Sequence, residues 1–580
     1  MVSLLVVLLI ALPWLGAACA ALANGRDPRR LHVLAAGFAL ATGCVAVAAL
    51  FLARSAAAVR LPLGGVFGDF ILVPDGLGLL IAAVASIVGS LAVIFAVNYM
   101  HADEQLSRFY AFMLFFIGAM NGLGLSGSLL FTFVFWEITA LCSYALISFH
   151  NDDLKAVAGG VKALVMTQLG GVGLLAGALL LYSHQGNYEI SAFLANPQVL
   201  PAGVLALLAF GLLAGSAAKS AQVPFHSWLP DAMEAPTPVT ALIHAATMVN
   251  AGVYLLARFY PAFAAVPGWR LTVMIVGAAS ALVGGLQAAC ALDLKRALAF
   301  STISQLGFMV YAVGAGGIFP AALHLLSHAL FKALLFLSSG AIITALGTRD
   351  LRQMGGLGRK MPFVRAAFVI GALGLAGLPI ANGFFSKDLV LESGLAGGPA
   401  WLYALMLFAV ALTACYSLRL VWLVFYGQRR GPEPAHDGLP AMRFSLAALA
   451  FATLTSWLLA GPLSSLLAST LPAQALVSRS TGSLVLDLLA SPWTWLTLAV
   501  VALGFGVYLL RGWLAAPLRW LRPVVEGGFG FPWLERQVIG ATRWISERLQ
   551  RLQTGQLNWN AFGLLAGLLA VLAVLAGAAR

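Results

Sequence analysis

Residues 211–238 read GLLAGSAAKSAQVPFHSWLPDAMEAPTP, and this stretch decides the fold that we expect. It begins as a membrane helix and places Lys219 inside the apolar run. Pro224 removes a backbone donor and clashes with the preceding turn, so the helix should end just after the lysine. A charged side chain costs roughly 2.5–3.5 kcal/mol inside a bilayer, and broken helices occur there only where protein or an enclosed wet cavity surrounds them. The stretch predicts a buried, functional lysine; the alternative is a lysine that reaches the interface from a helix end.

The composition of the 580-residue chain is that of a polytopic membrane protein rather than of several soluble domains. Hydrophobic residues make up 61% of the chain and charged residues 9%. We expect an all-α fold with about 14–16 transmembrane helices, because about 20 apolar residues span a bilayer as a helix. The candidate spans are residues 3–22, 31–53, 76–98, 109–126, 128–149, 161–182, 203–222, 237–257, 271–291, 297–315, 319–345, 364–386, 400–426, 444–461, 492–510 and 559–578.

The net charge of +12 reflects membrane topology rather than nucleic acid binding. When the N-terminus is placed outside, most of the 33 lysines and arginines fall in the loops of one side, as the positive-inside rule requires. The sequence therefore predicts a multi-pass membrane protein with both termini on the outer side. We place it in a bacterial inner (cell) membrane, where the outer side is periplasmic.

The five cysteines are scattered through the apolar spans without paired spacing. That pattern cannot build a zinc site, an iron–sulfur cluster or a c-type haem attachment. We therefore expect no metal, no cofactor and no redox centre in this chain.

Several other ionisable residues lie within apolar spans, where they are rare unless they are functional or paired. Glu137 lies in the middle of one span, and His244 lies in the span that follows the broken helix. His324, His328 and Lys332 are spaced by four residues, so they turn only about 40° per step and share one helix face. Histidine, whose ordinary pKa is near 6.5, is suited to passing protons near neutrality. We interpret these residues as a proton relay; for His244 alone, a satisfied core histidine is the alternative.

A second interrupted helix follows at residues 377–392, GLPIANGFFSKDLVLE. Pro379 and Gly383 break it, and Lys387 and Asp388 follow directly. Paired interrupted spans in the two halves of a chain indicate an internally repeated transporter.

The expected organisation has six parts. They are a transmembrane scaffold at 1–108 with a short extended excursion or hairpin near 60–75, a first repeat at 109–260, a second repeat at 271–426, further spans at 427–510, a lateral amphipathic segment at 511–558 and a last span at 559–580. In the amphipathic segment apolar residues recur every three to five positions with arginines between them, as in helices that lie in the membrane interface.

Five strings in this sequence together resemble a known family. They are FWEITALCSYALISF (135–149), KSAQVPFHSWLPDAMEAPTPVTALIHAATMVNAGVYLLAR (219–258), LKRALAFSTISQLGFM (294–309), LHLLSHALFKALLF (323–336) and NGFFSKD (382–388). The strings resemble the antiporter-like subunits of respiratory complex I and of Mrp cation/proton antiporters, over roughly residues 60–430. The layout, with a lateral helix before the last span, is similar to complex I subunit L and to the A-type subunit of Mrp antiporters.

The resemblance implies a role for each matching residue. Glu137 corresponds to the glutamate of the fifth helix and Lys219 to the lysine of the seventh. His244 corresponds to the linking histidine, and His324, His328 and Lys332 to the central relay. Lys387 corresponds to the terminal lysine, with Asp388 beside it.

The resemblance also implies a proton-translocating subunit that works with other membrane subunits in a lipid bilayer. Our first expectation is a complex I-like assembly of the NADH-quinone oxidoreductase type, driven by quinone reduction elsewhere in the complex. The alternative is an Mrp-type Na⁺/H⁺ antiporter subunit, towards which MEAPTPV, GTRDLR and the non-acidic Gly171 point. A hydrogenase-linked or carbon-uptake complex, and a purely structural subunit, are further alternatives.

Overall fold

The computed structural model describes residues 2–23, 27–52, 57–101, 103–471, 473–474, 476–514 and 521–552. The chain divides into two compact units, Met1–Arg522 and Pro523–Arg580. The predicted last span at 559–580, and the parts of the predicted amphipathic segment at 515–520 and 553–558, lie outside the described residues.

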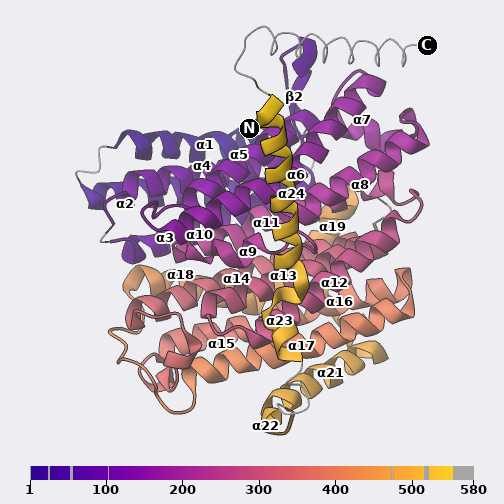
Figure 1. Ribbon diagram of the computed structural model, residues 1–580. Helices are drawn as coiled ribbons and strands as arrows, with labels where there is room; N and C mark the ends of the chain where they lie inside the picture. Colours follow the sequence, from indigo (N-terminus) through magenta and orange to yellow (C-terminus); the bar gives the residue numbers. More distant parts are fainter. Residues whose placement is uncertain are drawn as a thin grey trace. The chain divides into compact units, whose positions relative to one another are not determined.

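Long helices, packed side by side and alternating in direction, build the first unit (Figure 1). Of the described helical segments, 14 are long and apolar enough to cross a membrane. The prediction of an all-α polytopic membrane protein is therefore confirmed.

The first half of this unit carries the hairpin and the first broken helix. Its elements are α1 (Val2–Leu22), α2 (Pro28–Leu52), β1 (Val59–Pro62), η1 (Gly65–Phe67), β2 (Asp69–Leu72), α3 (Gly76–Tyr99), α4 (Leu106–Leu125), α5 (Leu129–Ile147), α6 (Leu154–Gln185), α7 (Ile190–Ala195), η2 (Pro197–Val199), α8 (Ala202–Lys219), α9 (Trp228–Asp231), η3 (Ala232–Glu234), α10 (Thr237–Ala241), η4 (Leu242–Ala246) and α11 (Met248–Phe263).

The second half carries the second broken helix. Its elements are α12 (Trp269–Cys290), α13 (Leu294–Ala315), α14 (Ile318–Leu346), η5 (Leu351–Gln353), η6 (Leu357–Arg359), α15 (Pro362–Ala376), α16 (Asn382–Gly397), α17 (Ala400–Phe425), α18 (Pro440–Thr455), η7 (Ser456–Leu459), α19 (Ala460–Thr470), α20 (Thr481–Ala490), α21 (Pro492–Leu509) and α22 (Arg511–Leu514).

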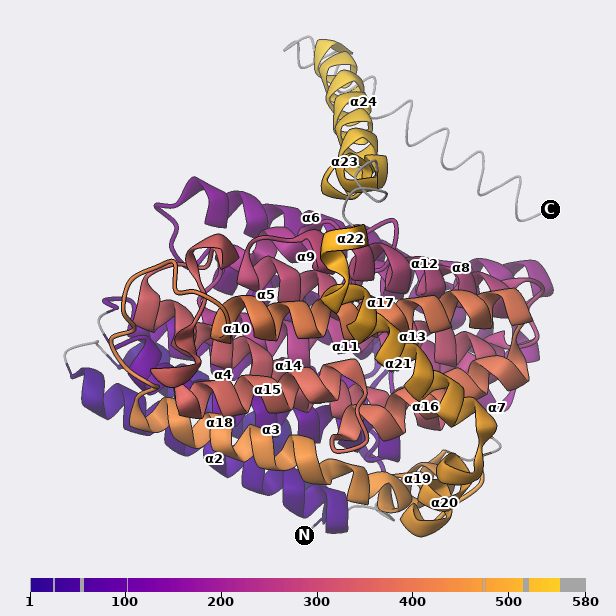
Figure 2. The same ribbon diagram turned by 90° about the horizontal axis from the view of Figure 1, so that it is seen from below.

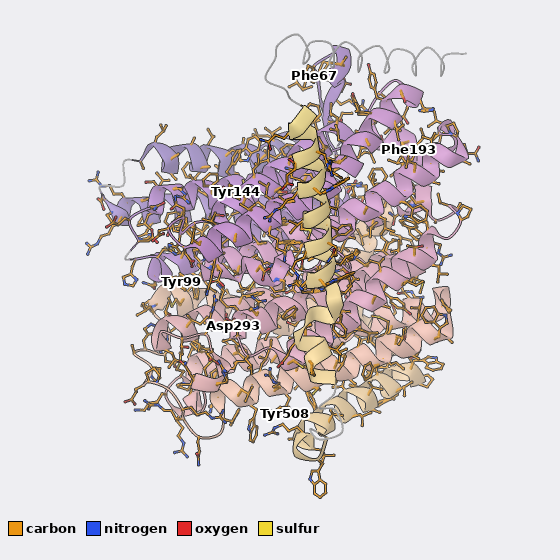
Figure 3. All side chains as sticks on the ribbon, in the orientation of Figure 1. Phe67, Tyr99, Tyr144, Phe193, Asp293 and Tyr508 are labelled. Carbon is orange, nitrogen blue, oxygen red and sulfur yellow. The ribbon has the colours of Figure 1, made fainter. Side chains whose placement is uncertain are left out.

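The predicted excursion near residues 60–75 is an antiparallel hairpin in which Val59 pairs with Leu72 and Pro62 with Asp69. Phe67 lies at its tip (Figure 3). We call the end of the helix bundle that carries this hairpin the hairpin face. The short helices α7, α19 and α20 lie together at one end of the bundle in Figure 2, and Gly76 at the start of α3 donates a backbone hydrogen bond to Thr470 at the end of α19.

Close helix packing depends on glycine. A Cβ added to Gly173 of α6 would lie 2.7 Å from the backbone oxygen of Gly211 in α8, and one added to Gly307 of α13 would lie 2.6 Å from the backbone nitrogen of Ala281 in α12. Small residues let membrane helices approach in this way.

The second unit is described up to Leu552. It contains η8 (Gly528–Gly530) and the 22-residue helix α24 (Phe531–Leu552), and α23 (Leu521–Glu526) lies at the boundary with the first unit. Large apolar side chains of α24 are exposed, among them Trp533, Val538, Ile539 and Trp544. The helix is amphipathic as predicted; its lateral position remains a prediction.

Candidate functional site

The first broken helix places Lys219 at the last position of α8. Gln222 donates its backbone N–H to the carbonyl of Ala217 (2.7 Å), and the indole of Trp228 donates to the carbonyl of Ala218 (3.0 Å), so protein groups satisfy carbonyls left free by the break. His226, in the segment that follows, is also buried, and burial lowers its pKa to about 4. This segment is therefore an enclosed turn rather than an exposed loop, as the sequence predicted.

Lys219 is fully buried, and its ammonium is held by α5. It donates a hydrogen bond of 2.8 Å to the carbonyl oxygen of Trp136 and lies 4.8 Å from the centre of the Trp136 ring. Among the described residues no ion pair joins it directly to Glu137, although the two groups interact electrostatically. The expected pair is therefore present as neighbours without direct contact.

The carboxylate of Glu137 is buried against α6. Neither of its oxygens has a hydrogen-bond partner of normal geometry among the described residues; Gln168 is a polar neighbour. A Cβ added to Gly171 of α6 would collide with Oε1 of Glu137. Gly171 therefore makes the room that this carboxylate occupies, a role that the sequence did not reveal.

His244 lies in η4, a π-helical turn inside the eighth span. The side chains of Thr247 and Asn250 donate to the carbonyls of Leu242 and Ala245, each five residues earlier (2.7 Å in both cases). Neither ring nitrogen of His244 has a partner among the described residues. Because π-helical turns are frequent at functional sites, this geometry favours a relay over a satisfied core histidine.

Two of the titratable residues of α14, His324 and Lys332, contact α13. His324 Nε2 donates to the side-chain oxygen of Gln305 (3.2 Å), and Nδ1 pairs with the hydroxyl of Ser386 in α16 (2.9 Å). Lys332 donates to the carbonyl of Leu298 (3.1 Å) and to the hydroxyl of Ser301.

His328, between them on the same helix, has no partner for either ring nitrogen among the described residues. It interacts electrostatically with Lys332, His324 and His244. Buried polar groups without a protein partner are the groups that ordered water normally satisfies.

The second broken helix positions Lys387 and Asp388 on different sides of α16. The ammonium of Lys387 donates to the carbonyl of Leu375 in α15 (2.7 Å) and lies 5.4 Å from the centre of the Phe308 ring. Asp388 instead accepts a hydrogen bond from the hydroxyl of Thr494 in α21. The two adjacent residues thus face different helices.

These side chains form two groups. Glu137 and Lys219 form one. The other contains His244, His324, His328, Lys332 and Lys387, which are linked by electrostatic interactions from His244 to Lys332 and from Lys332 to Lys387. Trp228 contacts residues near both groups: its indole donates to the carbonyl of Ala218, which precedes Lys219, and its ring centre is 6.4 Å from that of His244.

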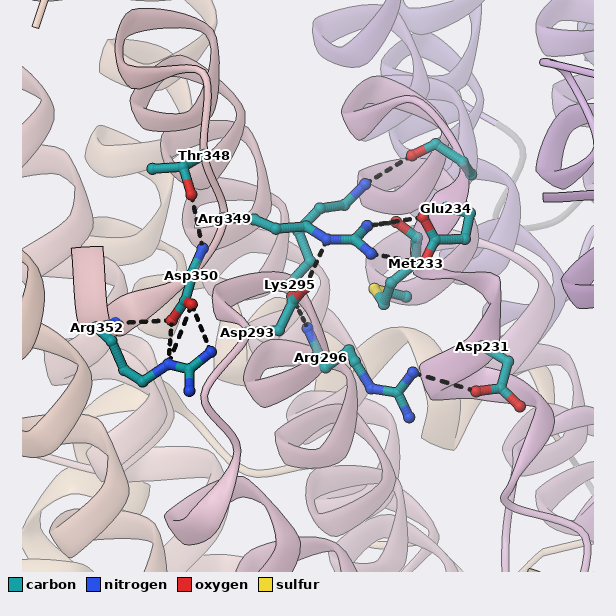
Figure 4. Close-up of polar contacts among 11 residues, drawn as sticks. Asp231, Met233, Glu234, Asp293, Lys295, Arg296, Thr348, Arg349, Asp350 and Arg352 are labelled. Atoms are coloured by element: carbon teal, nitrogen blue, oxygen red, sulfur yellow. Dashed lines mark hydrogen bonds and ion pairs between the residues drawn. The ribbon is translucent and has the colours of Figure 1, made fainter. Parts of the chain in front are cut away.

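A charged cluster joins the segment after the first broken helix to the second half of the unit (Figure 4). Arg349 forms a two-pronged ion pair with Glu234 (2.6 and 2.9 Å) and also contacts Asp293 (2.6 Å). Hydrogen bonding to Glu234 raises the pKa of Arg349. Glu234 belongs to the motif MEAPTPV and Arg349 to the motif GTRDLR, so this ion pair brings the two motifs together.

The same cluster fixes the segment at two further points. Asp231 lies between Lys162 of α6 (3.0 Å) and Arg296 of α13 (3.3 Å), and the ammonium of Lys295 donates to the carbonyl of Ala235 (2.6 Å). Within the described part of the chain, no group of three or more His, Cys, Asp or Glu residues could hold a metal ion.

Comparison with known sequences and structures identifies relatives of this architecture. The family described as "NADH:quinone oxidoreductase/Mrp antiporter, TM" matches residues 126–413, and "NADH-Ubiquinone oxidoreductase (complex I), chain 5 N-terminus" matches residues 62–110. The A1 subunit of a Na⁺/H⁺ antiporter from Staphylococcus aureus (strain bovine RF122 / ET3-1) is 39% identical over 412 residues, which cover 66% of this chain and 51% of the relative. The chain thus spans about half the length of the curated relatives it matches.

Two solved structures are similar over most of the chain. A chain of the Mrp complex from Dietzia sp. DQ12-45-1b superposes with a TM-score of 0.84 at 29% identity, over 99% of this chain and 63% of that one. A chain of the membrane-bound sulfane sulfur reductase, an archaeal respiratory membrane complex, superposes with a TM-score of 0.73 at 25% identity, over 83% of this chain and 99% of that one. The protein belongs to the antiporter-like subunit family of respiratory complex I and Mrp cation/proton antiporters.

Proposed function

We propose that this chain is the proton-translocating subunit of an Mrp-type Na⁺/H⁺ antiporter. The observation that carries the proposal is the series of buried lysines and histidines that runs from α8 through α14 to α16. Buried ionisable groups are costly inside a membrane protein, and their usual function is to move ions or protons. Of our two leading expectations, the named relatives favour Mrp over a complex I-like assembly.

In this proposal Glu137 and Lys219 form the loading pair. A carboxylate close to a buried ammonium stabilises its charge, and moving the carboxylate away destabilises that charge. Lys219 would therefore hold its proton when α5 brings Glu137 near and release it when the two separate. The broken end of α8 would supply the freedom for this movement.

The released proton would pass by way of His244 to Lys332, with His328 and His324 as intermediate carriers, and then to Lys387. Each histidine can accept a proton on one ring nitrogen while it donates from the other. The polar side chains of α13 that contact Lys332 and His324 would hold the path in place. Each transfer is reversible, so a proton gradient that is acidic outside would drive protons through these residues in the reverse order, from Lys387 to Lys219, while Na⁺ crosses the complex outward.

The proposal places the chain in a bacterial cell membrane with other membrane subunits as partners. The loops opposite the hairpin face carry most of the cations, so the hairpin face would be the outer, periplasmic side. The exposed apolar face of α24 would rest on lipid or on a neighbouring subunit.

A redox-driven complex is the second candidate, because the sulfane sulfur reductase chain is matched over 99% of its length. The same relay would then be driven by electron transfer in another subunit. The two candidates differ in what starts proton movement.

The distinguishing experiment uses everted membrane vesicles that contain the intact complex. An antiporter is expected to collapse an imposed pH gradient when NaCl is added, without NADH or any other electron donor. Proton movement that requires an electron donor and ignores Na⁺ would favour the redox-driven complex, and no proton movement under either condition would contradict both.

A further inference from the structure

Polar side chains continue along α16 beyond Lys387 towards the hairpin face. Asp388 and Glu392 are four residues apart and therefore lie on the same side of the helix. Asp388 is buried and contacts Thr494 of α21. Glu392, which is half-buried, interacts with the hydroxyl of Ser491 just before α21 and electrostatically with Asp388. The two carboxylates thus form successive steps along one interface, that between α16 and α21.

Two tyrosines on neighbouring helices turn buried hydroxyls towards the same region. Tyr311 is 0% and Tyr403 6% exposed, and neither hydroxyl has a hydrogen-bond partner among the described residues. The Tyr311 hydroxyl lies against Gly394 of α16, and Tyr403 interacts electrostatically with Asp388 and Glu392.

A buried hydroxyl that lacks any partner costs about 1–3 kcal/mol, so water normally satisfies such groups. We therefore expect ordered water between these two hydroxyls and the two carboxylates, and we call this series of polar groups the passage. This observation is independent of the carboxylates themselves.

The passage ends at the surface on α20. Asp487 and Arg479 form an ion pair of 3.5 Å, with side chains 62% and 53% exposed, and both interact electrostatically with Glu392. Because α20 packs against α19, whose last residue Thr470 binds the start of α3, this end opens at the hairpin face. Bulk water therefore reaches Asp487, which is the carboxylate furthest from Lys387.

We infer that Asp388, Glu392 and Asp487 form the outer path by which a proton travels between the hairpin face and Lys387. The inference rests on the proposed function. In the direction that the proton gradient drives, water beside Asp487 gives one proton to the Glu392 carboxylate, which passes it to the Asp388 carboxylate, and each carboxylate regains its negative charge when it gives the proton on. Because Asp388 and Lys387 face different helices, water carries the proton between them to the neutral Lys387 amine, which becomes an ammonium.

Carboxylates and hydroxyls could also bind Na⁺, but the passage leads to a lysine. A protonated Lys387 at its inner end would repel an entering cation, whereas a proton is accepted or released there without placing two positive charges together. The lysine at the inner end therefore favours a path for protons over a path for Na⁺. Movement of Na⁺ through the passage is one of the outcomes that the test distinguishes.

The first experiment measures Na⁺-dependent proton movement by the intact complex carrying Glu392→Gln or Asp487→Asn. Glu392→Gln keeps shape but cannot carry a proton, so we expect a loss of at least about tenfold, with Glu392→Asp restoring most of the rate. Asp487→Asn should slow transport several-fold.

Two carboxylates remote from the passage serve as matched controls. Glu433→Gln breaks an exposed ion pair with Lys360 (2.9 Å), and Asp27→Asn breaks an exposed pair with Arg30 (3.0 Å). Both should transport normally. Co-purification of the other subunits checks that every variant assembles.

The second experiment tests water access with a charged, membrane-impermeant thiol reagent. Thr497 of α21 lies beside Asp388, so a cysteine at this position would line the passage. Leu503 is 63% exposed on the same helix, so a cysteine there would face away from the passage. After the labelling of the parent chain is subtracted, the cysteine of Thr497→Cys should react in vesicles of one orientation only. The cysteine of Leu503→Cys should not react in vesicles of either orientation. If Thr497→Cys does not react from either side, the wet passage is wrong.

The remaining outcomes separate this inference from the proposed function. Full transport by Glu392→Gln, together with loss in Lys387→Ala, overturns the path and leaves the proposed function intact. A changed Na⁺ dependence in Glu392→Gln with an unchanged proton rate assigns the passage to Na⁺ and also overturns the proton path. Full transport by Lys387→Ala contradicts the relay itself.

Discussion

The ammonium of Lys219 donates its hydrogen bond of 2.8 Å to the carbonyl oxygen of Trp136, the residue that immediately precedes Glu137. The lysine ammonium is therefore bound to the backbone of α5 at the residue next to the glutamate. A small rotation of α5 relative to α8 would change both the hydrogen bond and the distance between the two charges. This geometry makes the pair sensitive to movements that neighbouring helices impose.

Gly171 should prove essential for the position of Glu137. In Gly171→Ala the new methyl group would occupy the place of Oε1, so the carboxylate must move. We expect transport to fall roughly tenfold or more, since small displacements of reacting groups are that costly, and we expect its pH dependence to shift. The measurement is the initial rate of Na⁺-dependent proton movement between pH 6.5 and 9. Gly37→Ala, where an added Cβ meets no atom within 4 Å, should behave like the parent chain.

Ser386 is predicted to orient His324. Ser386→Ala removes the hydroxyl that pairs with Nδ1 (2.9 Å), which should reduce transport several-fold and cost about 1 kcal/mol of stability. Ser386→Thr, which keeps the hydroxyl, should restore much of the rate. The control is Ser393→Ala on the same helix; among the described residues the Ser393 hydroxyl bonds only to the local backbone carbonyl of Val390. Equal rates for Ser386→Ala and the parent would show that this bond does not matter for transport.

The ion pair between Glu234 and Arg349 should hold the segment after the first broken helix. Because both side chains are partly buried, with 18% and 35% exposure, breaking the pair should lower stability by roughly 1–3 kcal/mol. Glu234→Gln, Arg349→Met and the double variant form a thermodynamic cycle that can be read from thermal unfolding of the purified complex. A coupling free energy near zero in this cycle would mean that the ion pair itself does not stabilise the protein.

The hairpin should loosen in acid. Hydrogen bonding and attraction from Arg60 hold the pKa of Glu189 below its ordinary value of 4.5. The pair therefore contributes stability at neutral pH, and this contribution is lost as the pH falls below 4.5 through the lowered pKa. Its size is at most about 1 kcal/mol because Arg60 is half exposed. Amide hydrogen exchange of residues 59–72, corrected for intrinsic rates, should show less protection at pH 3.5 than at pH 7, and Arg60→Gln should remove the difference.

Much of the fold could be predicted because membrane helices follow directly from apolar run length. The first break follows from Pro224 and the second from Pro379, and in the structure a helix ends before each proline. Gly383, which was also expected to break the second helix, instead lies in the first turn of α16. The common face of His324, His328 and Lys332 follows from helical periodicity alone. In the structure, Gln305 and Ser301 of α13 contact His324 and Lys332 of this face.

Other features depend on contacts between distant segments and could not be predicted. The π-helical turn at His244 leaves no periodic signal in the sequence, although Thr247 and Asn250 stabilise it. The divergence of Lys387 and Asp388 depends on which helices pack on each side of α16. The meeting of Glu234 with Arg349 joins residues that local patterns cannot connect. Whether the two halves are repeats, and where α24 lies, remain predictions.

The most direct test of the proton relay is Na⁺-dependent proton movement in everted vesicles containing the assembled complex with Lys219→Ala. Lys155→Ala, which removes an exposed lysine at the start of α6, is the matched control. The account predicts that Lys219→Ala abolishes proton movement while all subunits still co-purify, and that Lys155→Ala retains it. Transport by assembled Lys219→Ala at the rate of the parent complex would contradict the account.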